Sequence, residues 1–385
     1  MLELDLTQDE IPCGTNIKII GVGGAGGNAV NTMIENSLTG VEFIAANTDI
    51  IDLKKSNAKI KLQLGKKTTK GLGAGANPEK GRKSAEESRE EIRKVLDGAD
   101  MLFIAAGMGG GTGTGAAPII ASLAKELEIL TIAIVNRPFI EEGKKKMINA
   151  EAGIKKLYEI VDSIIVVPNE KLRIEFPNIT VEEAFKKADN ILYEAAKAVS
   201  DIINTSGYIK VDFADVKTVM SNGGFALMSS AIGEGDDRAS KAVKNAMNNS
   251  LLEDIKIEKC PGILVNITAG KDFKVEELGI INKEINMRAT DKSDIILGLI
   301  FDDEMVGKIK VTLIATGLGS KENSVYEIEE IRSSGEEHEE IGDMLKRVKS
   351  TTNTMDIKKK SHPKTKNDGG SLQMDIPAFM RKFSN

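Results

Sequence analysis

Short apolar runs alternate with segments of helical periodicity along the first half of the chain. The apolar runs are rich in β-branched residues, as strands usually are. They lie at 16–22, 41–49, 59–65, 101–107, 130–139 and 163–169. The segments between them, such as 28–38 and 78–98, combine apolar spacings of three and four with good helix formers. This alternation predicts an α/β fold with a mainly parallel, Rossmann-like sheet and helices on both faces.

A longer amphipathic segment follows at 181–204. Its apolar residues recur at spacings of three and four, the pattern of one buried helix face. Thr180 is placed to act as the N-cap, and Glu182 and Glu183 favour the positive end of the helix dipole. We expect one long helix that packs along the core and connects two halves of the molecule.

The pattern from 205 to 318 predicts a second, smaller α+β domain. Helices are predicted at 215–233, 237–252 and 275–289. Three apolar runs with strand character lie at 262–270, 295–304 and 308–318. Because turns and one short helix separate these runs, they are expected to form a small mixed or antiparallel sheet.

The two ends of the chain differ in composition from this folded part. Residues 1–15 lack the basic and apolar regions of a signal peptide and are expected to form a flexible extension. From 320 to 371 the chain is polar, acidic first and basic later, which predicts a disordered linker. Segment 372–385 is apolar and aromatic again, as is typical of a partner-binding peptide on a tether. Between these ends we predict a nucleotide-binding domain at 16–179, the connecting helix at 180–204 and the second domain at 205–319.

Composition narrows the classes of function. A formal net charge of -6 argues against a general nucleic-acid binder. The two cysteines, Cys13 and Cys260, are too few for a disulfide framework or a zinc site, which indicates a reducing, cytoplasmic compartment. Both histidines, His338 and His362, fall in the predicted linker, which excludes serine-type triads from the folded part. No apolar stretch reaches the roughly 18 residues of a membrane span, so no direct membrane insertion is expected.

Two glycine-rich segments each follow a predicted strand and precede a predicted helix. They read GVGGAGGN at 21–28 and GGGTGTG at 109–115. Such loops offer consecutive backbone N–H groups and a positive helix terminus to an anion, and glycine lets a phosphate approach closely. Two loops of this kind at the same edge of a sheet predict a site for a polyphosphate.

Neither loop fits the commonest nucleotide motifs. Gly21, Gly23 and Gly26 satisfy GxGxxG, but Asp49 lies 28 residues from Gly21 rather than the about 20 expected of an NAD-binding domain. A Walker A motif is also missing, since Arg82 occupies the lysine position of the nearest match. An NAD-dependent oxidoreductase is therefore an alternative that leaves the second loop unexplained.

Several motifs in register resemble the FtsZ family, the bacterial relatives of tubulin. They are both glycine loops, NTD at 47–49, GLGAGANP at 71–78, VDFADVKTVMSN at 211–222 and the terminal DIPAFMRK at 375–382. The resemblance covers about residues 15–318 and the terminal peptide. It implies a tubulin-like fold and a cytoplasmic GTPase that polymerises head to tail into protofilaments of the mid-cell division ring. GTP, GDP and Mg²⁺ are the implied ligands, and no side chain is assigned as a direct metal ligand.

The resemblance also implies roles for particular residues. The nucleotide contacts would be Gly24, Ala25, Gly26, Gly27, Asn28, Gly110, Gly111, Thr112, Gly113, Thr114, Glu142, Lys146, Asn169, Phe185 and Asp189. Within this set, Glu142 and Lys146 would lie on the ribose side, and Phe185 and Asp189 at the base. A carboxylate can accept hydrogen bonds from N1–H and N2–H of guanine but would repel the acceptor of adenine, which fits selectivity for GTP.

The catalytic residues implied by the resemblance are Asp212 and Asp215, which would reach the nucleotide of the next subunit and position water or the cation. Aspartates at a predicted helix start could otherwise serve as caps. Two residues depart from the family pattern: Lys210 replaces an asparagine, and Lys146 replaces an arginine that could form two parallel hydrogen bonds. We therefore expect an active but slow GTPase. A relative that polymerises with almost no hydrolysis is a further alternative.

The terminal peptide is expected to bind membrane-tethering adaptors and division regulators. Its implied contacts are Asp375, Ile376, Pro377, Phe379 and Arg381, three apolar anchors between charged groups. The other expected partner is the chain itself, as a head-to-tail homopolymer.

Overall fold

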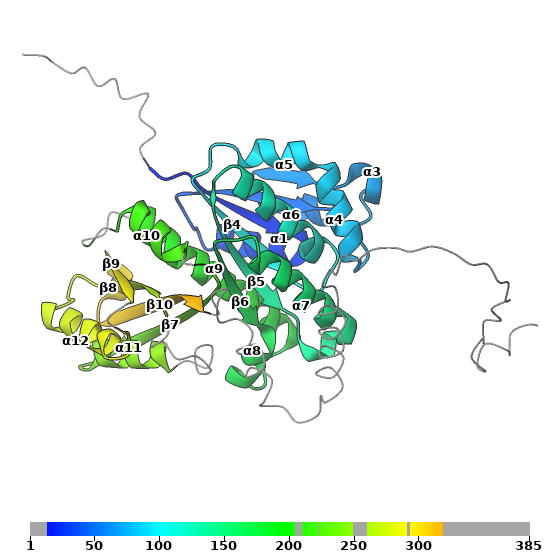
Figure 1. Ribbon diagram of the computed structural model, residues 1–385. Coiled ribbons are helices and arrows are strands. Elements are labelled where there is room, and N and C mark those ends of the chain that lie inside the picture. The colour runs from blue at the N-terminus through cyan, green and yellow to red at the C-terminus, as the bar shows by residue number, and fades with distance from the viewer. Residues whose placement is uncertain are drawn as a thin grey trace, which may run out of the picture. The chain divides into compact units, whose positions relative to one another are not determined.

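The computed structural model describes residues 14–204, 209, 211–221, 223–248, 260–290 and 293–318. The predicted linker at 320–371 and the predicted peptide at 372–385 lie outside the described residues, as does nearly all of the extension at 1–15. The described residues form one ten-stranded sheet in the order β3-β2-β1-β4-β5-β6-β7-β10-β8-β9, with helices packed against it (Figure 1). No helix among them is long and apolar enough to cross a membrane.

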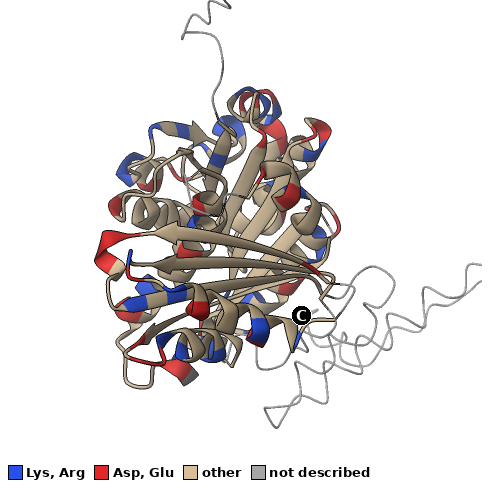
Figure 2. Ribbon diagram, turned by 90° about the vertical axis from the view of Figure 1, so that its left-hand side faces the viewer, with Lys and Arg blue, Asp and Glu red and all other residues tan. Residues whose placement is uncertain are grey.

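Six parallel strands form the first part of the sheet and confirm the six predicted ones. They are β1 (Ile17–Val22), β2 (Val41–Asn47), β3 (Ile60–Gln63), β4 (Met101–Gly107), β5 (Leu130–Arg137) and β6 (Ser163–Pro168). Neighbouring strands pair in parallel throughout. Every residue of β1 is buried, as expected of a strand that is covered on both faces. Figure 2 shows that the helices carry most of the charged residues and the strands few.

Helices cover both faces of these strands. On one face lie α1 (Gly23–Glu35) and α9 (Val181–Asn204). On the other lie α4 (Pro78–Glu87), α5 (Arg89–Leu96), α6 (Thr112–Glu126) and α7 (Lys144–Tyr158). Shorter helices complete the connections: α2 (Ile50–Lys55), α3 (Lys66–Thr69), η1 (Ile140–Glu142) and α8 (Asn169–Glu175).

The long helix α9 has the predicted bounds and the predicted cap. The hydroxyl of Thr180 accepts a hydrogen bond from the backbone N–H of Glu183 at 3.2 Å, and the Glu183 carboxylate accepts one from the N–H of Thr180 at 2.8 Å. This reciprocal pair satisfies two backbone donors that the first helical turn leaves free.

The direction of α9 is opposite to that of the parallel strands. Near its start, Asp189 lies beside the loops at the carboxyl ends of the strands. At its end, the Asn204 amide donates to the carbonyl of Gly40, which directly precedes β2. At 1.5 Å per residue, the helix rises about 22 Å from Asp189 to Asn204. The helix thus extends from the carboxyl ends of the parallel strands to their amino ends.

The second part of the fold continues the same sheet. Its strands are β7 (Phe225–Glu234), β8 (Gly262–Ala269), β9 (Asp294–Phe301) and β10 (Lys308–Leu318), and its helices are α10 (Phe213–Met220), α11 (Arg238–Met247), α12 (Val275–Asn286) and η3 (Asp303–Met305). β10 pairs antiparallel with β7 and β8, and β8 pairs parallel with β9, so this part is mixed, one of the two predicted arrangements. The prediction of a separate small sheet is wrong, because these strands are continuous with the parallel ones. Two residue pairs between β6 and β7 join it to the first part.

The prediction of a helix at 215–233 is wrong in its second half. α10 ends at Met220, and 225–234 forms strand β7 instead. Gly223 and Gly224 have φ of 72° and 91°, a conformation that ends the helix and that side chains disfavour. Helix formers in 225–234 suggested a continuous helix, but pairing along β10 decides the conformation. The helix predicted at 237–252 is α11 as far as Met247, and residues 249–252 lie outside the described part.

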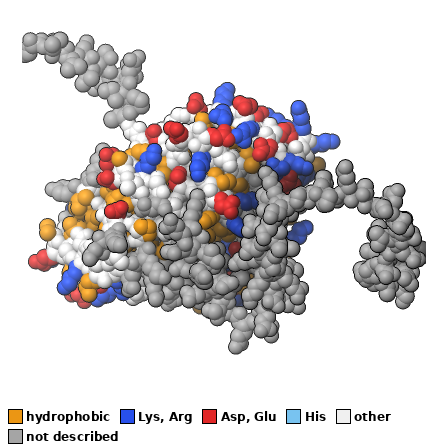
Figure 3. Space-filling view, viewed as in Figure 1, with side chains coloured by type: hydrophobic (Ala, Val, Ile, Leu, Met, Phe, Trp, Pro, Cys, Tyr) orange, Lys and Arg blue, Asp and Glu red, His pale blue; other side chains and the backbone are white. Residues whose placement is uncertain are grey.

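Two glycines let α4 and α6 cross in close contact. A methyl group on Gly115 of α6 would lie 2.0 Å from the carbonyl oxygen of Pro78, and one on Gly81 of α4 would lie 2.1 Å from that of Gly111. The second glycine loop is therefore held against the start of α4. Charged side chains of both signs project over α4 and α5 at the top of Figure 3.

We predict that Gly115→Ala lowers the free energy of unfolding by about 1–3 kcal/mol, because the added methyl group forces the two helices apart. Gly279→Ala in α12 is the matched control, since no atom lies within 4 Å of the added methyl group. That control should stabilise the protein by about 0.5–1 kcal/mol. Urea unfolding of both variants measures the difference, and equal effects would contradict the close contact.

Candidate functional site

The two glycine loops meet at the carboxyl edge of the parallel strands. α1 begins at Gly23 directly after β1, and α6 begins at Thr112 after the turn that follows β4. A methyl group on Gly23, whose φ is 77°, would lie 3.0 Å from the backbone nitrogen of Gly113. The backbones of the two loops are therefore in contact, which only a residue without a side chain allows.

A cavity of about 300 Å³ opens between these loops and the start of α9. Its volume and its lining of backbone amides suit a nucleotide. Twelve of the predicted nucleotide contacts line it: Gly24, Ala25, Asn28, Gly110, Gly111, Thr112, Gly113, Glu142, Lys146, Asn169, Phe185 and Asp189. Segments that are far apart in the sequence thus converge on one site, as the resemblance implied.

Three predicted contacts lie outside the lining of this cavity. A methyl group on Gly26 would lie 2.3 Å from the carbonyl oxygen of Ala105, so this glycine allows α1 to pack on β4. The Thr114 hydroxyl is buried and accepts a hydrogen bond from the N–H of Gly109 at 2.8 Å, which holds the second loop in shape. Gly27 lines a neighbouring hollow instead.

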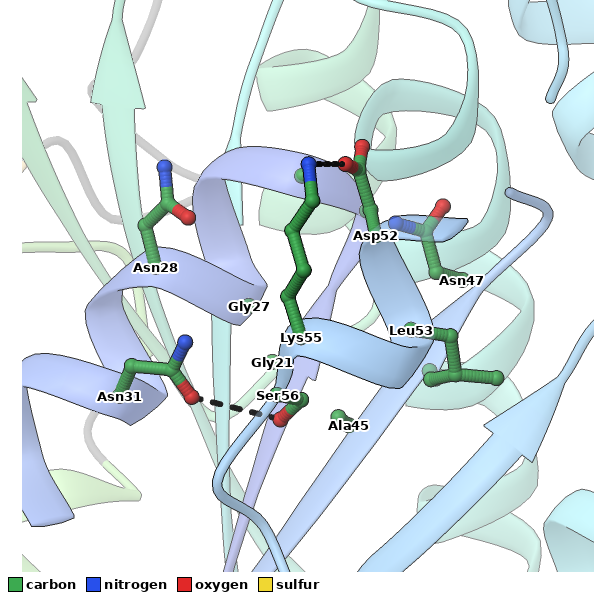
Figure 4. Close-up of a pocket in the computed structure, with 13 residues that line it drawn as sticks. Gly21, Gly27, Asn28, Asn31, Ala45, Asn47, Asp52, Leu53, Lys55 and Ser56 are labelled. Atoms are coloured by element: carbon green, nitrogen blue, oxygen red, sulfur yellow. Dashed lines mark hydrogen bonds and ion pairs between the residues drawn. The ribbon is translucent and has the colours of Figure 1, made fainter. Parts of the chain in front are cut away.

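That neighbouring hollow, of about 250 Å³, lies between α1 and α2 (Figure 4). Ser56 donates a hydrogen bond to the Asn31 side chain at 3.4 Å, and Lys55 pairs with Asp52 at 3.2 Å. This hollow shares Gly23, Gly24 and Asn28 with the main cavity and separates α2 from the first loop.

Asn136 lines the main cavity but was not among the predicted contacts. Its side chain is 6% exposed, and its Oδ1 accepts no hydrogen bond from any described residue; Oδ1 of Asn169 is also unpaired and 3% exposed. Buried acceptors without partners are costly and are expected to have a ligand group opposite them. The only sequence signal for Asn136 was its place at the carboxyl end of a predicted strand.

Paired hydroxyl groups fasten the second loop to the segment after β2. The hydroxyls of Thr48 and Thr112 lie 2.6 Å apart, and the Thr69 hydroxyl donates to the carbonyl of Thr48 at 3.2 Å. The N–H of Gly73 donates to the same carbonyl at 3.3 Å. Loop 71–77 and the second glycine loop are therefore positioned together around Thr48.

Charged groups occupy the part of the cavity after β5. Lys146 pairs with Glu142 at 3.0 Å, and Glu142 also accepts a hydrogen bond from the N–H of Phe139 at 2.9 Å. Phe139 and Phe185 pack edge to face, with ring centroids 5.5 Å apart. The two rings support the start of α9 where Asp189 enters the cavity.

Burial raises the pKa of Asp189 to about 7. The cause is desolvation, because burial penalises the charged form of the carboxyl group. A carboxyl group whose pKa rises on folding stabilises the folded state below its unfolded pKa, and this contribution is lost as pH rises through about 7. Desolvation therefore destabilises the ionised form of Asp189, and a ligand that donates hydrogen bonds to it would offset this cost.

Asp212 and Asp215 lie away from this cavity, at the start of α10. Both side chains are exposed, and Asp212 makes no side-chain capping bond. A methyl group on Gly298 of β9 would lie 3.2 Å from Ile202 and 3.7 Å from Val211, so the segment before Asp212 packs at the end of α9. Lys210 and the five predicted partner-binding residues of the terminal peptide lie outside the described residues.

Comparison with known proteins decides the family. The model of the Tubulin/FtsZ family GTPase domain matches residues 16–175, and that of the FtsZ family C-terminal domain matches residues 224–319. The chain belongs to the FtsZ family. It is a tubulin-like GTPase of cell division that binds GTP and GDP. Membership of the FtsZ family also rules against the NAD-dependent alternative.

Relatives of similar length and a solved structure agree with this assignment. The chain is 44% identical to "Cell division protein FtsZ" of Coxiella burnetii over 401 residues, covering 100% of this chain and 99% of the relative. It is 46% identical to the protein of the same name from Azotobacter vinelandii over 386 residues, covering 97% and 98%. A solved empty FtsZ dimer of M. jannaschii is 40% identical, covers 79% of this chain and 88% of its own, and superimposes with a TM-score of 0.75.

We predict that the raised pKa of Asp189 makes the ligand-free protein lose stability between pH 5 and pH 8 relative to Asp189→Asn. The uncharged amide has no ionisation that burial would penalise, so the two proteins should diverge by at least about 1 kcal/mol, the equivalent of one pKa unit. Urea unfolding at both pH values measures the difference. Parallel pH profiles would show that Asp189 is not desolvated.

Proposed function

We propose that this chain forms head-to-tail protofilaments and that each GTP site is completed by Asp212 and Asp215 of the next subunit. The observation that carries the proposal is the distance between these carboxylates and the cavity of their own chain. α9 rises about 22 Å from Asp189 beside the cavity to Asn204, which is bound to Gly40 at the amino ends of the strands. The segment before Asp212 packs near this end of α9. A hydrolase needs a group that positions the attacking water, and the lining of the cavity offers few candidates.

Stacking copies along the direction of α9 brings the two places together. The carboxyl edge of one subunit, with its cavity, would face the α10 end of the next one. Exposed apolar side chains near this edge suit such a contact, because Leu72 in loop 71–77 is 82% exposed and Ile51 in α2 is 64% exposed. The empty FtsZ dimer of M. jannaschii shows that a relative self-associates.

The cavity suggests a role for each part of GTP. Backbone N–H groups of the two loops, at Gly24, Ala25 and Gly110 to Gly113, would hold the phosphates. Glu142 and Lys146 would face the ribose. Phe185 would pack against the base, and the Asp189 carboxylate would accept hydrogen bonds from guanine N1–H and N2–H.

The charge of the phosphates requires a counter-ion beyond Lys146. No group of three or more His, Cys, Asp or Glu residues in the described part could hold a metal ion. Among the lining residues, Thr112 would offer its hydroxyl oxygen as a ligand for Mg²⁺. The remaining ligands would be phosphate oxygens and water. Such an ion would neutralise part of the phosphate charge.

The proposal extends to location and partners. We place the polymer on the cytoplasmic side of the division site, where the cell-division proteins that this chain resembles would act. The peptide with Ile376, Pro377 and Phe379 would bind membrane-tethering adaptors and division regulators by its apolar side chains. The lysines at 146 and 210, where the family has other residues, would make hydrolysis slow.

The position of Asn136 leads to a prediction about the ribose. In register, Asn136 lies between Gly107 on the phosphate side and Val167 on the side of the base. Its unpaired Oδ1 should therefore accept a hydrogen bond from a ribose hydroxyl. We expect either 2′-deoxy-GDP or 3′-deoxy-GDP to bind about tenfold more weakly than GDP. The weaker analogue is the one that lacks the donating hydroxyl and leaves Oδ1 of Asn136 buried and unpaired.

Asn136→Leu has a similar shape without the acceptor and should bind the three nucleotides equally. Titration calorimetry on both proteins gives the complete cycle of variant and ligand. If the preference survives in the leucine variant, another group reads the ribose.

Mixing two inactive variants tests whether the site is shared. Asp212→Ala keeps an intact cavity, and Asp189→Ala keeps intact carboxylates at the other end. Each alone should lose GTPase activity, by about a hundredfold for Asp212→Ala, the cost of a missing positioning group. In an equal mixture, about a quarter of the interfaces would combine the two intact halves, as random head-to-tail contacts require, and activity should return accordingly.

The control is a mixture of Asp212→Ala with Asp215→Ala, in which every interface lacks one carboxylate. This mixture should stay inactive. If the first mixture gives no more than the sum of its parts while it still forms polymers, the carboxylates act within their own chain or not at all.

A further inference from the structure

A band of lysines follows the free edge of the sheet beside β3. We name it the lysine edge and define it as Lys54, Lys55, Lys59, Lys61, Lys66, Lys67 and Lys70. All seven side chains are exposed. Between residues 54 and 78 there is no Asp or Glu, although the whole chain has a net charge of -6. The positive charge is thus concentrated in one short segment.

The fold places this segment on one side of the molecule. β3 is the outermost strand, and α2 and α3 flank it in sequence. The Lys61 ammonium donates to the carbonyl of Lys54 at 3.3 Å, which ties the strand to the end of α2. In the view of Figure 1, α3 lies at the upper right, and Figure 3 shows blue side chains projecting there.

Most of this charge is not neutralised within the protein. Lys55 pairs with Asp52 at 3.2 Å, but no described residue forms an ion pair with Lys54, Lys59, Lys61, Lys66 or Lys70. Glu87 lies nearby, yet its carboxylate is occupied by the backbone N–H groups of Lys67 and Thr68 at 2.7 and 2.9 Å. The lysine edge is therefore available to an external anion.

Protection of a sheet edge explains only a small part of the band. A lysine on an edge strand prevents pairing with other chains. Within β3 itself, Lys61 is the lysine that serves this purpose. The other six lie before or after the strand, where there is no ladder to protect.

We propose that the lysine edge binds the anionic headgroups of a lipid bilayer. Lysines near an anionic membrane surface each add to the attraction, with no need for a shaped pocket. Residues 54–70 contain no arginine for paired phosphate contacts and no aromatic ring for base stacking, so nucleic acid is less well matched. On the face turned to the viewer in Figure 2, acidic and basic residues are interspersed.

The lysine edge gains its effect from the proposed polymer, on which this inference rests. Head-to-tail stacking uses the carboxyl ends of the parallel strands and the opposite, α10 end. β3 is the outermost strand, so its unpaired side, with Lys54, Lys59 and Lys61, is not covered by such stacking. Every subunit of a protofilament would then present its lysines along one line. A planar anionic surface can engage such a line at many points at once, which turns a weak contact into stable attachment. The contact is peripheral and requires no insertion.

The test uses the purified full chain and vesicles of phosphatidylglycerol and phosphatidylcholine in equal parts, with pure phosphatidylcholine vesicles for comparison. Sedimentation with GTP should recover the protein on the anionic vesicles at low salt but not at high salt. A variant with Gln at Lys59, Lys61, Lys66, Lys67 and Lys70 should lower the bound fraction at least about tenfold. The matched control has Gln at Lys94, Lys155, Lys156, Lys241 and Lys283, which are also exposed and lie on other helices.

Light scattering and GTPase rate are recorded on the same samples to separate this inference from the proposed function. Loss of vesicle binding in the first variant, with polymerisation and the control unchanged, supports the lysine edge as the lipid-binding surface. Equal binding of both variants would overturn it, as would a wild-type chain that polymerises but ignores anionic vesicles. Retention on RNA or on poly-glutamate in preference to the vesicles would overturn it as well. A wild-type chain that fails to polymerise would instead contradict the proposed function.

Discussion

The length and direction of α9 are the constraint on which the account of this protein depends. The helix begins beside a cavity at the carboxyl edge of the parallel strands and ends at Gly40, beyond their amino edge. The segment that follows α9 in the chain therefore starts at the amino ends of the parallel strands. Because Asp212 and Asp215 follow α9, the cavity between the glycine loops and these carboxylates of the same chain lie far apart.

The cavity itself is built from close backbone contacts rather than from charged side chains. Gly23 contacts the second glycine loop, and Gly81 allows α4 to pack against Gly111 of the same loop. The paired hydroxyls of Thr48 and Thr112 add loop 71–77 to this assembly. A site formed in this way is rigid where phosphates would bind, and its selectivity has to come from the α9 side, where Asp189 is desolvated and ready to accept hydrogen bonds.

Periodicity alone was sufficient for the parallel strands and for α9, because each is buried along one face or more and carries the matching apolar spacing. It failed at 225–234, where helix formers take strand conformation under pairing with β10, a contact distant in sequence. Twelve of the predicted nucleotide contacts line one cavity. The two glycine loops could be predicted from their place between a strand and a helix, whereas the other contacts came from the resemblance to the FtsZ family. Asn136 escaped prediction since nothing local distinguishes a buried, unpaired amide from any other asparagine at a strand end. The separation of Asp212 from the cavity could not be predicted, because it depends on the direction of α9 relative to the strands.

The most direct test of the shared site is the GTPase rate per subunit of the wild-type chain, measured over a range of protein concentrations with filaments counted in parallel. Sites that form only between subunits require the specific rate to be near zero at low concentration and to rise above a threshold, together with filament mass. A specific rate that stays constant down to concentrations at which filaments are absent would contradict the account, because an isolated chain would then complete its own site.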